Sequence, residues 1–163
     1  VADALAALGH TYVHLRNAQA SPLLNRALQI YRRKTPDNFE VLSRTVTALG
    51  LLAEAQSKRP DAITHYREAL QLRKLWAQKA DRTPDAEDAD LYVRLTSLGL
   101  AEKDFEVALH AWREARTLAQ SDAAKEEVAS LAQRLGPALL EAGREEDASS
   151  VLQVALQAQR GDG

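Results

Sequence analysis

The feature of this sequence that most constrains its fold is a repeated pattern of small and large residues. Four times, a large apolar residue lies between two alanines seven positions apart: Ala20-Leu24-Ala27, Ala62-Tyr66-Ala69, Ala108-Trp112-Ala115 and Ala148-Leu152-Ala155. The second alanine of each set follows the previous one by 42, 46 and 40 residues. A self-similar period of this size is typical of stacked helix pairs, in which no repeat buries its apolar face alone. The pattern therefore predicts a surface that holds another molecule rather than a pocket for chemistry.

Each set predicts one packed face of a helix, because residues three, four and seven apart share a helix face. The small residues let a neighbouring helix come close, and the large residue fills the gap. An upstream partner helix carries the pairs Leu8-Gly9, Leu49-Gly50 and Leu135-Gly136. A glycine inside a helix costs about 0.5–1 kcal/mol relative to alanine. Its recurrence after leucine therefore predicts a tight helix–helix crossing.

These residues resemble the tetratricopeptide repeat, which has Leu-Gly and an aromatic residue in its first helix and Ala, an aromatic residue and Ala in its second. The stretches RALQIYRRKTPDN and REALQLRKLWAQKADRTPDAED resemble the longer variant, with a period near 42, of kinesin light chains and bacterial peptide-sensing regulators. The third unit departs from the pattern, because Thr96 stands at the glycine position and Gly99 comes three residues late. The resemblance implies an all-α, right-handed superhelix of antiparallel helix pairs, with about four repeats and eight helices.

Prolines and capping residues predict where the helices lie. We expect helices at about 2–17, 22–34, 36–56, 60–79, 84–102, 104–119, 122–142 and 144–160, and no strand. In Thr35-Pro36-Asp37 and Thr83-Pro84-Asp85, threonine is expected to cap a helix and proline to occupy its first turn. The chain is expected to be a single array over 1–163, with repeats at roughly 1–35, 36–82, 83–120 and 121–163.

One residue conflicts with this helical pattern. Pro137 falls in the middle of the seventh predicted helix, where proline removes a backbone hydrogen bond and clashes with the preceding turn. Two outcomes are open at this point: a kinked helix, or a helix that breaks and restarts.

Composition is that of a globular helical protein, with 45% hydrophobic residues and few aromatic ones. No stretch approaches the ~18 apolar residues of a membrane span. The absence of cysteine excludes disulfides and leaves the compartment open, with the cytoplasm favoured. Methionine is also absent, even at residue 1, which predicts a fragment of a longer protein or a processed N-terminus. Ala- and Arg-rich usage hints at a bacterial source.

The charge is divided unevenly along the chain. Residues 1–82 carry 13 Lys and Arg against 7 Asp and Glu, a net of +6, whereas residues 83–163 carry 8 against 16, a net of −8. Such asymmetry favours head-to-tail attraction or an asymmetric partner. The basic residues of the first half include Arg32, Arg33, Lys34, Arg67, Arg73, Lys74, Lys79 and Arg82. Nucleic acid is disfavoured as a partner, because most of them fall on the second helices of the repeats, which the resemblance implies face outward.

No pattern for catalysis or for a cofactor is present. His10 and His14 lie four apart on one predicted helix, but neither an HExxH motif nor a cysteine supplies further metal ligands. The acidic cluster at Asp85, Glu87, Asp88 and Asp90 begins a helix, where carboxylates are favoured electrostatically. A phosphate-binding glycine loop and a nucleophile elbow are both absent. We therefore expect no enzyme activity, no cofactor and no metal site.

The resemblance also implies a partner-binding groove lined by the first helix of each repeat. The inward-facing positions would be Asp3, Ala6, His10, Val13, Arg44, Thr47, Leu51, Glu54, Asp90, Val93, Ser97, Leu100, Ser130, Gln133, Pro137 and Leu140. Family members that grip the C-terminal carboxylate of a chaperone have Lys and Asn where this chain has Ala6 and His10, and a second Asn where it has Ala48. That carboxylate clamp is therefore absent. The apolar floor that remains suits an extended peptide or an amphipathic helix.

The last predicted helix carries two apolar stripes. Its inner stripe is expected to be Ala148, Leu152, Ala155 and Leu156. The second, Val151, Val154 and Ala158, is expected to face outward and to meet a continuation of the chain, a second copy or the partner.

The function that the sequence predicts is a non-catalytic scaffold that binds a protein or a peptide. The alternatives are a module that oligomerises its parent protein and a ligand-sensing domain of a bacterial regulator.

Overall fold

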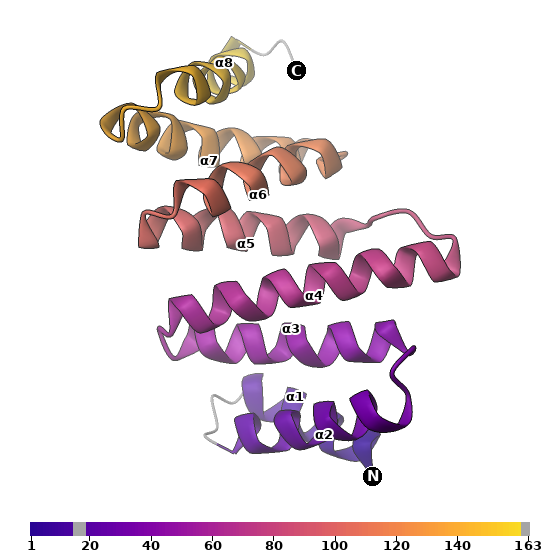
Figure 1. The fold of residues 1–163 in the computed structure, drawn as a ribbon. Coiled ribbons are helices and arrows are strands. Elements are labelled where there is room, and N and C mark those ends of the chain that lie inside the picture. The colour runs from indigo at the N-terminus through magenta and orange to yellow at the C-terminus, as the bar shows by residue number, and fades with distance from the viewer. Residues whose placement is uncertain (15–18, 161–163) are drawn as a thin grey trace. The chain divides into compact units, whose positions relative to one another are not determined.

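The structure, a computed structural model, describes residues 1–14 and 19–160. Over these residues the chain is all-α, without a strand (Figure 1). Its eight helices are α1 (Ala2–His14), α2 (Ala20–Lys34), α3 (Phe39–Ala55), α4 (Arg59–Ala80), α5 (Ala86–Glu102), α6 (Phe105–Leu118), α7 (Asp122–Glu141) and α8 (Glu145–Arg160). Each lies where the sequence predicts a helix, and the all-α expectation is confirmed. Residues 15–17 of the first predicted helix lie outside the described residues.

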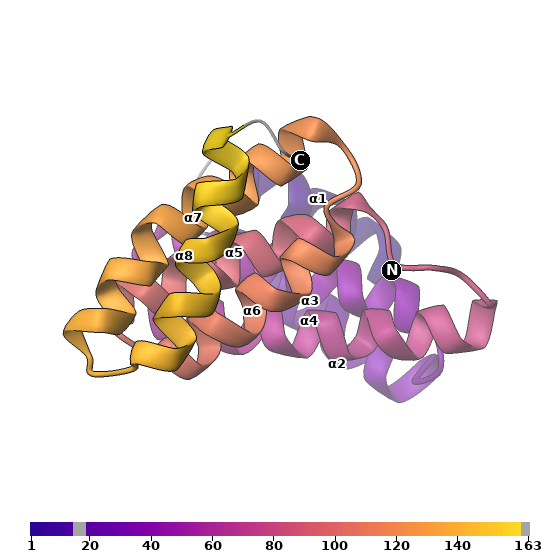
Figure 2. The ribbon, with the colours of Figure 1, turned by 90° about the horizontal axis from the view of Figure 1, so that it is seen from above.

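The chain divides into two compact units, residues 1–83 and 84–163. The first unit holds the helix pairs α1–α2 and α3–α4, and the second holds α5–α6 and α7–α8. Within each unit the pairs are stacked, because α3 packs against both α1 and α2, and α7 packs against both α5 and α6. Figure 2 shows α7 and α8 side by side at the end of the second unit. A single array over 1–163 stays a prediction.

The turns inside three of the pairs repeat the same backbone conformation. Ser57, Lys103 and Gly143 have positive φ angles of 58°, 57° and 73°. Each lies five residues before the first alanine of its set, at Ala62, Ala108 and Ala148 respectively. The period read from the alanines is thus also the period of the left-handed turn that reverses the chain.

Glycines set the distance between the helices of three pairs. A Cβ atom on Gly9 would lie 2.7 Å from Leu24, and one on Gly50 would lie 2.5 Å from Tyr66. A Cβ on Gly136 would overlap Leu152 in the same way. In all three pairs the glycine therefore faces the large central residue of the alanine set. The predicted tight crossings are confirmed.

The third pair crosses differently because threonine replaces this glycine. Thr96 is fully buried, and its hydroxyl donates a hydrogen bond to the Tyr92 carbonyl (2.8 Å). Gly99 instead meets the backbone of Ala108, 2.7 Å from its amide nitrogen. Trp112, also fully buried, donates from its indole nitrogen to the Val128 carbonyl of α7 (3.0 Å). The central aromatic residue thus ties the third pair to the fourth.

Two predicted helix caps are wrong. Thr35 ends α2, its amide donating to the Tyr31 carbonyl, and α3 begins only at Phe39. Thr83 likewise lies ahead of α5, which begins at Ala86. A capping side chain must immediately precede the first helical residue to reach the free amides. The caps are instead Asn38 for α3 and Asp85 for α5, while Ser121 caps α7 near its predicted start.

Pro137 does not break its helix. Helix α7 runs from Asp122 to Glu141 with Pro137 inside it, and the proline ring is exposed. The alternative of a helix that stops and restarts is therefore wrong.

Candidate functional site

The predicted groove residues of α3, α5 and α7 form an accessible stripe on each of these helices. All twelve of them are partly or fully exposed, whereas neighbouring positions such as Val46, Ala48 and Leu49 on α3 are buried. These stripes, called the accessible stripes below, are Arg44, Thr47, Leu51 and Glu54 on α3; Asp90, Val93, Ser97 and Leu100 on α5; and Ser130, Gln133, Pro137 and Leu140 on α7. Each belongs to the first helix of its pair.

Helix α1 offers less surface than the sequence predicts. Ala6 and Val13 are only 8% and 9% exposed, so they belong to the core of the first unit. Asp3 is exposed and His10 is half-buried. Since α1 packs against both α2 and α3, two of its four predicted groove positions are covered by neighbouring helices.

Two carboxylates assigned to the groove are bonded to tyrosines of the second helices. Asp3 accepts a hydrogen bond from the Tyr31 hydroxyl, and Glu54 accepts one from the Tyr66 hydroxyl, each at 2.7 Å. These bonds tie α1 to α2 and α3 to α4. Residue spacing does not show these bonds, because it identifies Tyr66 only as the large residue of its alanine set and gives Tyr31 no role. The sequence signal for such a bond is a tyrosine on one helix of a pair and an acidic residue on the other.

Burial and nearby carboxylates raise the pKa values of two buried tyrosines, Tyr31 and Tyr92. The pKa of Tyr31 is raised from 10.0 to about 12. Burial is the largest cause of this rise, and the hydrogen bond to Asp3 is the second. In the third pair, burial and then the charge of Glu114 raise the pKa of Tyr92 from 10.0 to about 12. Three of the pairs therefore contain a tyrosine next to a carboxylate of the paired helix.

The apolar side chains of the accessible stripes differ in exposure. Leu140 is 48% exposed, and Leu51 and Leu100 are half-buried. Val13, the apolar groove position predicted on α1, is buried instead. The accessible apolar surface thus comes from α3, α5 and α7.

A pocket of about 340 Å³ lies inside the second unit, where α5 begins, α6 ends and α7 begins. It is lined by Pro84, Asp85, Ala86, Ala89, Asp90, Val93, Ala115, Leu118, Ala119, Gln120, Ser121, Ala124, Glu127 and Val128. Two members of the α5 stripe, Asp90 and Val93, form part of its wall. No periodic pattern reveals such a pocket, because it arises where three helix ends converge.

The charged groups of this pocket are all carboxylates. Asp85 accepts hydrogen bonds from the amides of Glu87 (3.0 Å) and Asp88 (3.2 Å), so it is engaged as the cap of α5. Asp90 pairs with Arg94 one helical turn away, at 2.9 Å. The Glu127 side chain is exposed, and no hydrogen bond or ion pair joins it to the part of the chain that the structure describes.

The outward stripe predicted on α8 is wrong in its first member, Val151. Val151 is fully buried, whereas Leu156, expected to face inward, is 53% exposed. The inner face is formed by Ala148, Val151 and Ala155, which follow the three-and-seven spacing of one helix face. Val154 is half-buried and Ala158 exposed, so these residues form no continuous apolar stripe with Val151.

The structure describes the side chain of only one of the two histidines that the sequence places four residues apart. His10 is half-buried on α1, and the side chain of His14 lies outside the described residues. Among the residues that the structure does describe, no group of three or more His, Cys, Asp or Glu side chains is placed to hold a metal ion. Within the same residues, every helix is too short or too polar to cross a membrane.

Comparisons with known proteins give a structural neighbour. No family model matches the sequence, and no curated protein matches it either. The crystal structure of BtubC (BKLC) from P. vanneervenii is similar to this chain, with a TM-score of 0.69 and 19% sequence identity. The match covers 99% of this chain but only 65% of BtubC, less than two thirds of its length. At this identity the likeness shows the fold alone. The fold is all-α with stacked helix pairs, and the likeness to BtubC is consistent with a helical-repeat fold like that of tetratricopeptide repeats.

Proposed function

We propose that this chain is a non-catalytic scaffold that binds a protein or a peptide on the accessible stripes of α3, α5 and α7. One observation carries the proposal: Leu51, Leu100 and Leu140 remain accessible on the first helices of three successive pairs. Apolar surface left in water is unfavourable by about 25 cal/mol per Å². Periodic apolar side chains on helix faces are the way helical scaffolds take up extended or helical peptides.

We also propose that the repeats of this chain are of the longer tetratricopeptide variant. Spacings of 42, 46 and 40 residues between the alanine sets support it, as does the length of α4, which has 22 residues. The likeness to BtubC shows the fold alone, and what BtubC binds is not transferred to this chain.

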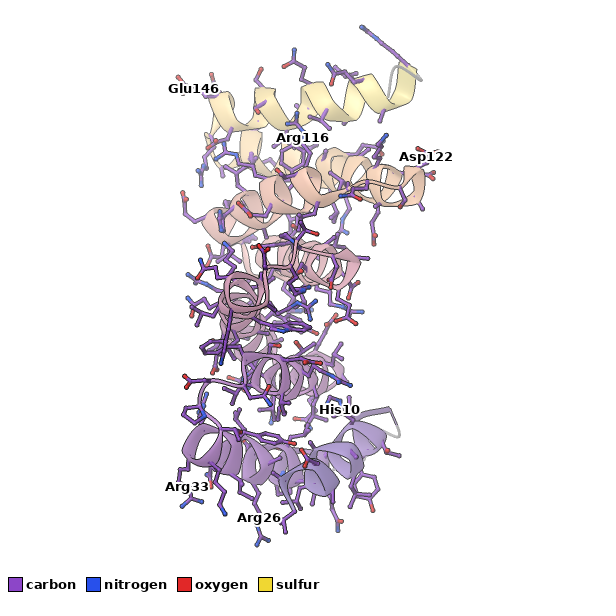
Figure 3. The ribbon with its side chains drawn as sticks, turned by 90° about the vertical axis from the view of Figure 1, so that its right-hand side faces the viewer. His10, Arg26, Arg33, Arg116, Asp122 and Glu146 are labelled. Carbon is purple, nitrogen blue, oxygen red and sulfur yellow. The ribbon has the colours of Figure 1, made fainter. Side chains whose placement is uncertain are left out.

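A protein partner suits the charge of the accessible stripes better than a nucleic acid does. Arg44 is the one basic residue among the twelve stripe positions, so these surfaces offer few phosphate contacts. The basic residues of the first unit lie mainly on α2 and α4. Figure 3 shows Arg26 and Arg33 projecting outward from α2.

The test compares capture of partners by wild type and by single Leu-to-Glu variants. Leu100→Glu and Leu140→Glu alter two accessible stripes, and Leu156→Glu alters a leucine of the second helix α8 that is 53% exposed, against 48% for Leu140. The immobilised full chain is exposed to extract, and the captured proteins are quantified by mass spectrometry. We expect both stripe variants to lose specific partners and Leu156→Glu to retain them, with unchanged helical circular dichroism in all three.

Two results would contradict the proposal. Undiminished capture by both stripe variants would show that the stripes are not the binding surface. Unfolding of Leu140→Glu would show that this leucine belongs to the core, since a buried unpaired charge is strongly destabilising.

Assembly of several copies is the second candidate, and the division of charge favours it. The net charges of +6 on residues 1–82 and −8 on residues 83–163 would attract two copies in a head-to-tail arrangement. Light scattering at low and high salt distinguishes the candidates. Salt-sensitive oligomers would favour assembly, whereas a monomer at all salt concentrations would exclude this form of it.

A further inference from the structure

The pocket of the second unit has apolar walls and is large enough to take an aliphatic side chain. Its volume of about 340 Å³ lies at the lower end of the range of ligand pockets, roughly 300–1,000 Å³. Aliphatic groups come from all three helices: Val93 on α5, Leu118 on α6, and Ala124 and Val128 on α7. A site with such walls gains from burying an aliphatic group.

The polar groups of the pocket select against an anion. No lysine or arginine is among its lining residues, whereas Asp85, Asp90 and Glu127 are. Helix N-termini commonly bind anions through free amides, but here capping side chains already occupy several of these amides. The Asp85 carboxylate accepts from the first amides of α5, and the Ser121 hydroxyl accepts from the Ala124 amide of α7.

Two features instead favour a cation or an N–H donor. Glu127 is an exposed carboxylate at the pocket wall with no partner among the described residues. The end of α6, at Leu118 and Ala119, forms another wall, and the last carbonyl groups of a helix lack intrahelical partners and carry partial negative charge. The second unit as a whole adds to this bias, since residues 83–163 carry a net charge of −8.

We propose that this pocket binds a basic peptide segment, with an aliphatic side chain inserted between α5 and α7 and an adjacent lysine or arginine facing Glu127. This inference rests on the proposed function. It adds that the part of the partner that meets the α5 stripe is basic and aliphatic. Apolar walls supply the affinity, and the carboxylates reject acidic segments by placing like charges together.

The peptide continues along the α5 stripe. Val93 in the pocket wall and Leu100 further along α5 are seven residues apart, which is about 10 Å at 1.5 Å per residue. A peptide in the extended polyproline II conformation has three residues per turn, so every third side chain lies on the same face, about 9 Å apart at ~3.1 Å per residue. A segment with two aliphatic residues three positions apart and basic residues between them therefore matches both the pocket and the stripe.

The test uses a defined probe and the full chain. A fluorescein-labelled peptide, Gly-Ser-Leu-Arg-Lys-Leu-Ser-Gly, is titrated by fluorescence anisotropy. Two comparison peptides carry Glu-Glu in place of Arg-Lys, or Ser in place of both leucines. We expect the basic peptide to bind at least about tenfold more tightly than either comparison peptide. The Glu-Glu peptide loses the attraction to the pocket carboxylates, and the Ser peptide loses the apolar side chains.

Matched variants locate the binding. Ala124→Phe fills the pocket, whereas Ala123→Phe adds the same ring at an exposed neighbouring position outside it. Glu127→Lys reverses a pocket charge, and Glu141→Lys reverses an exposed charge elsewhere on α7. We expect Ala124→Phe to abolish binding and Glu127→Lys to weaken it about tenfold. Both controls should bind as wild type does. Because Glu127 is exposed, its variant remains informative if Ala124→Phe fails to fold.

Three outcomes would overturn the inference: no binding of the basic peptide, binding that Ala124→Phe and Glu127→Lys leave unchanged, or tighter binding of the acidic peptide. Acidic peptide binding that Ala124→Phe abolishes would refute only the chemistry assigned to the partner. The proposed scaffold function would then stand, since the capture experiment with Leu100→Glu and Leu140→Glu tests it separately.

Discussion

At the residue scale, the missing side chain of Gly50 decides how closely α3 and α4 approach. In an open helix, Gly50→Ala would stabilise the chain by about 0.5–1 kcal/mol. Here the added Cβ would lie 2.5 Å from the Tyr66 ring, which is fully buried and cannot move aside. Overpacking of this kind costs about 1–3 kcal/mol. We therefore expect a net loss of stability in urea unfolding. Ser130→Ala, at an exposed position, should change stability by less than about 0.5 kcal/mol.

Whether Gly50→Ala lowers or raises the free energy of unfolding decides between a tight helix crossing and an open helix face. A stabilised variant would mean that the helices of the second pair do not cross at this glycine. The tight crossing, and the repeat register built on it, would then be incorrect.

The buried tyrosines predict a loss of stability in alkali. The pKa values of Tyr31 and Tyr92 are raised from 10.0 to about 12, so folding opposes their deprotonation. Their stabilising contribution is complete below pH 10, the value for the unfolded chain, and is lost as the pH rises toward about 12. We expect the double variant Tyr31→Phe, Tyr92→Phe to show a flatter decline of melting temperature over this range. An unchanged decline would show that other groups cause it.

At the element scale, Pro137 is a local cost that α7 tolerates. Proline inside a helix is about 3 kcal/mol less favourable than alanine. The helix continues through Pro137 and the ring is exposed, so Pro137→Ala should restore a backbone hydrogen bond with little loss of packing. We expect a higher melting temperature, measured by circular dichroism. A lower one would show that the proline shapes the helix in a way the fold requires.

The helices and their packed faces could be predicted because spacing alone determines which residues share a face. All eight alanines of the repeated sets are buried, and the Leu-Gly pairs mark crossings in three of the four helix pairs. Residue spacing could not fix the ends of helices, which depend on whether Thr35 or Asn38 lies next to the first helical residue. Nor could it decide the inner face of α8, where Val151 and Leu156 exchanged their expected positions.

The site was predictable only in part, for a similar reason. Helix periodicity identifies the stripes of α3, α5 and α7, because positions on one face follow from the register. The pocket depends on how three helix ends converge, and the Tyr31–Asp3 and Tyr66–Glu54 bonds depend on the rotation of paired helices. Both are properties of tertiary packing that a single sequence does not display.

At the scale of the whole molecule, the chain joins two compact units of opposite charge. Residues 1–83 contain the first two helix pairs and residues 84–163 the last two. The acidic unit contains the pocket proposed to take a basic segment, and the basic excess lies in the other unit. The first unit presents the accessible stripe of α3, and the second presents those of α5 and α7. A partner with an uneven charge distribution would therefore meet a different surface chemistry in each unit.

Site-specific photo-crosslinking tests most directly whether the first helices hold the partner. A photoreactive residue is placed at Ser97 or Gln133 on the accessible stripes, or at Gln71 or Gln153, which are exposed on the second helices α4 and α8. Binding on the first helices predicts covalent partner adducts from Ser97 and Gln133 and none from the other two. Adducts that form only from Gln71 or Gln153 would contradict the account, because the partner would then bind the outer surface of the repeats.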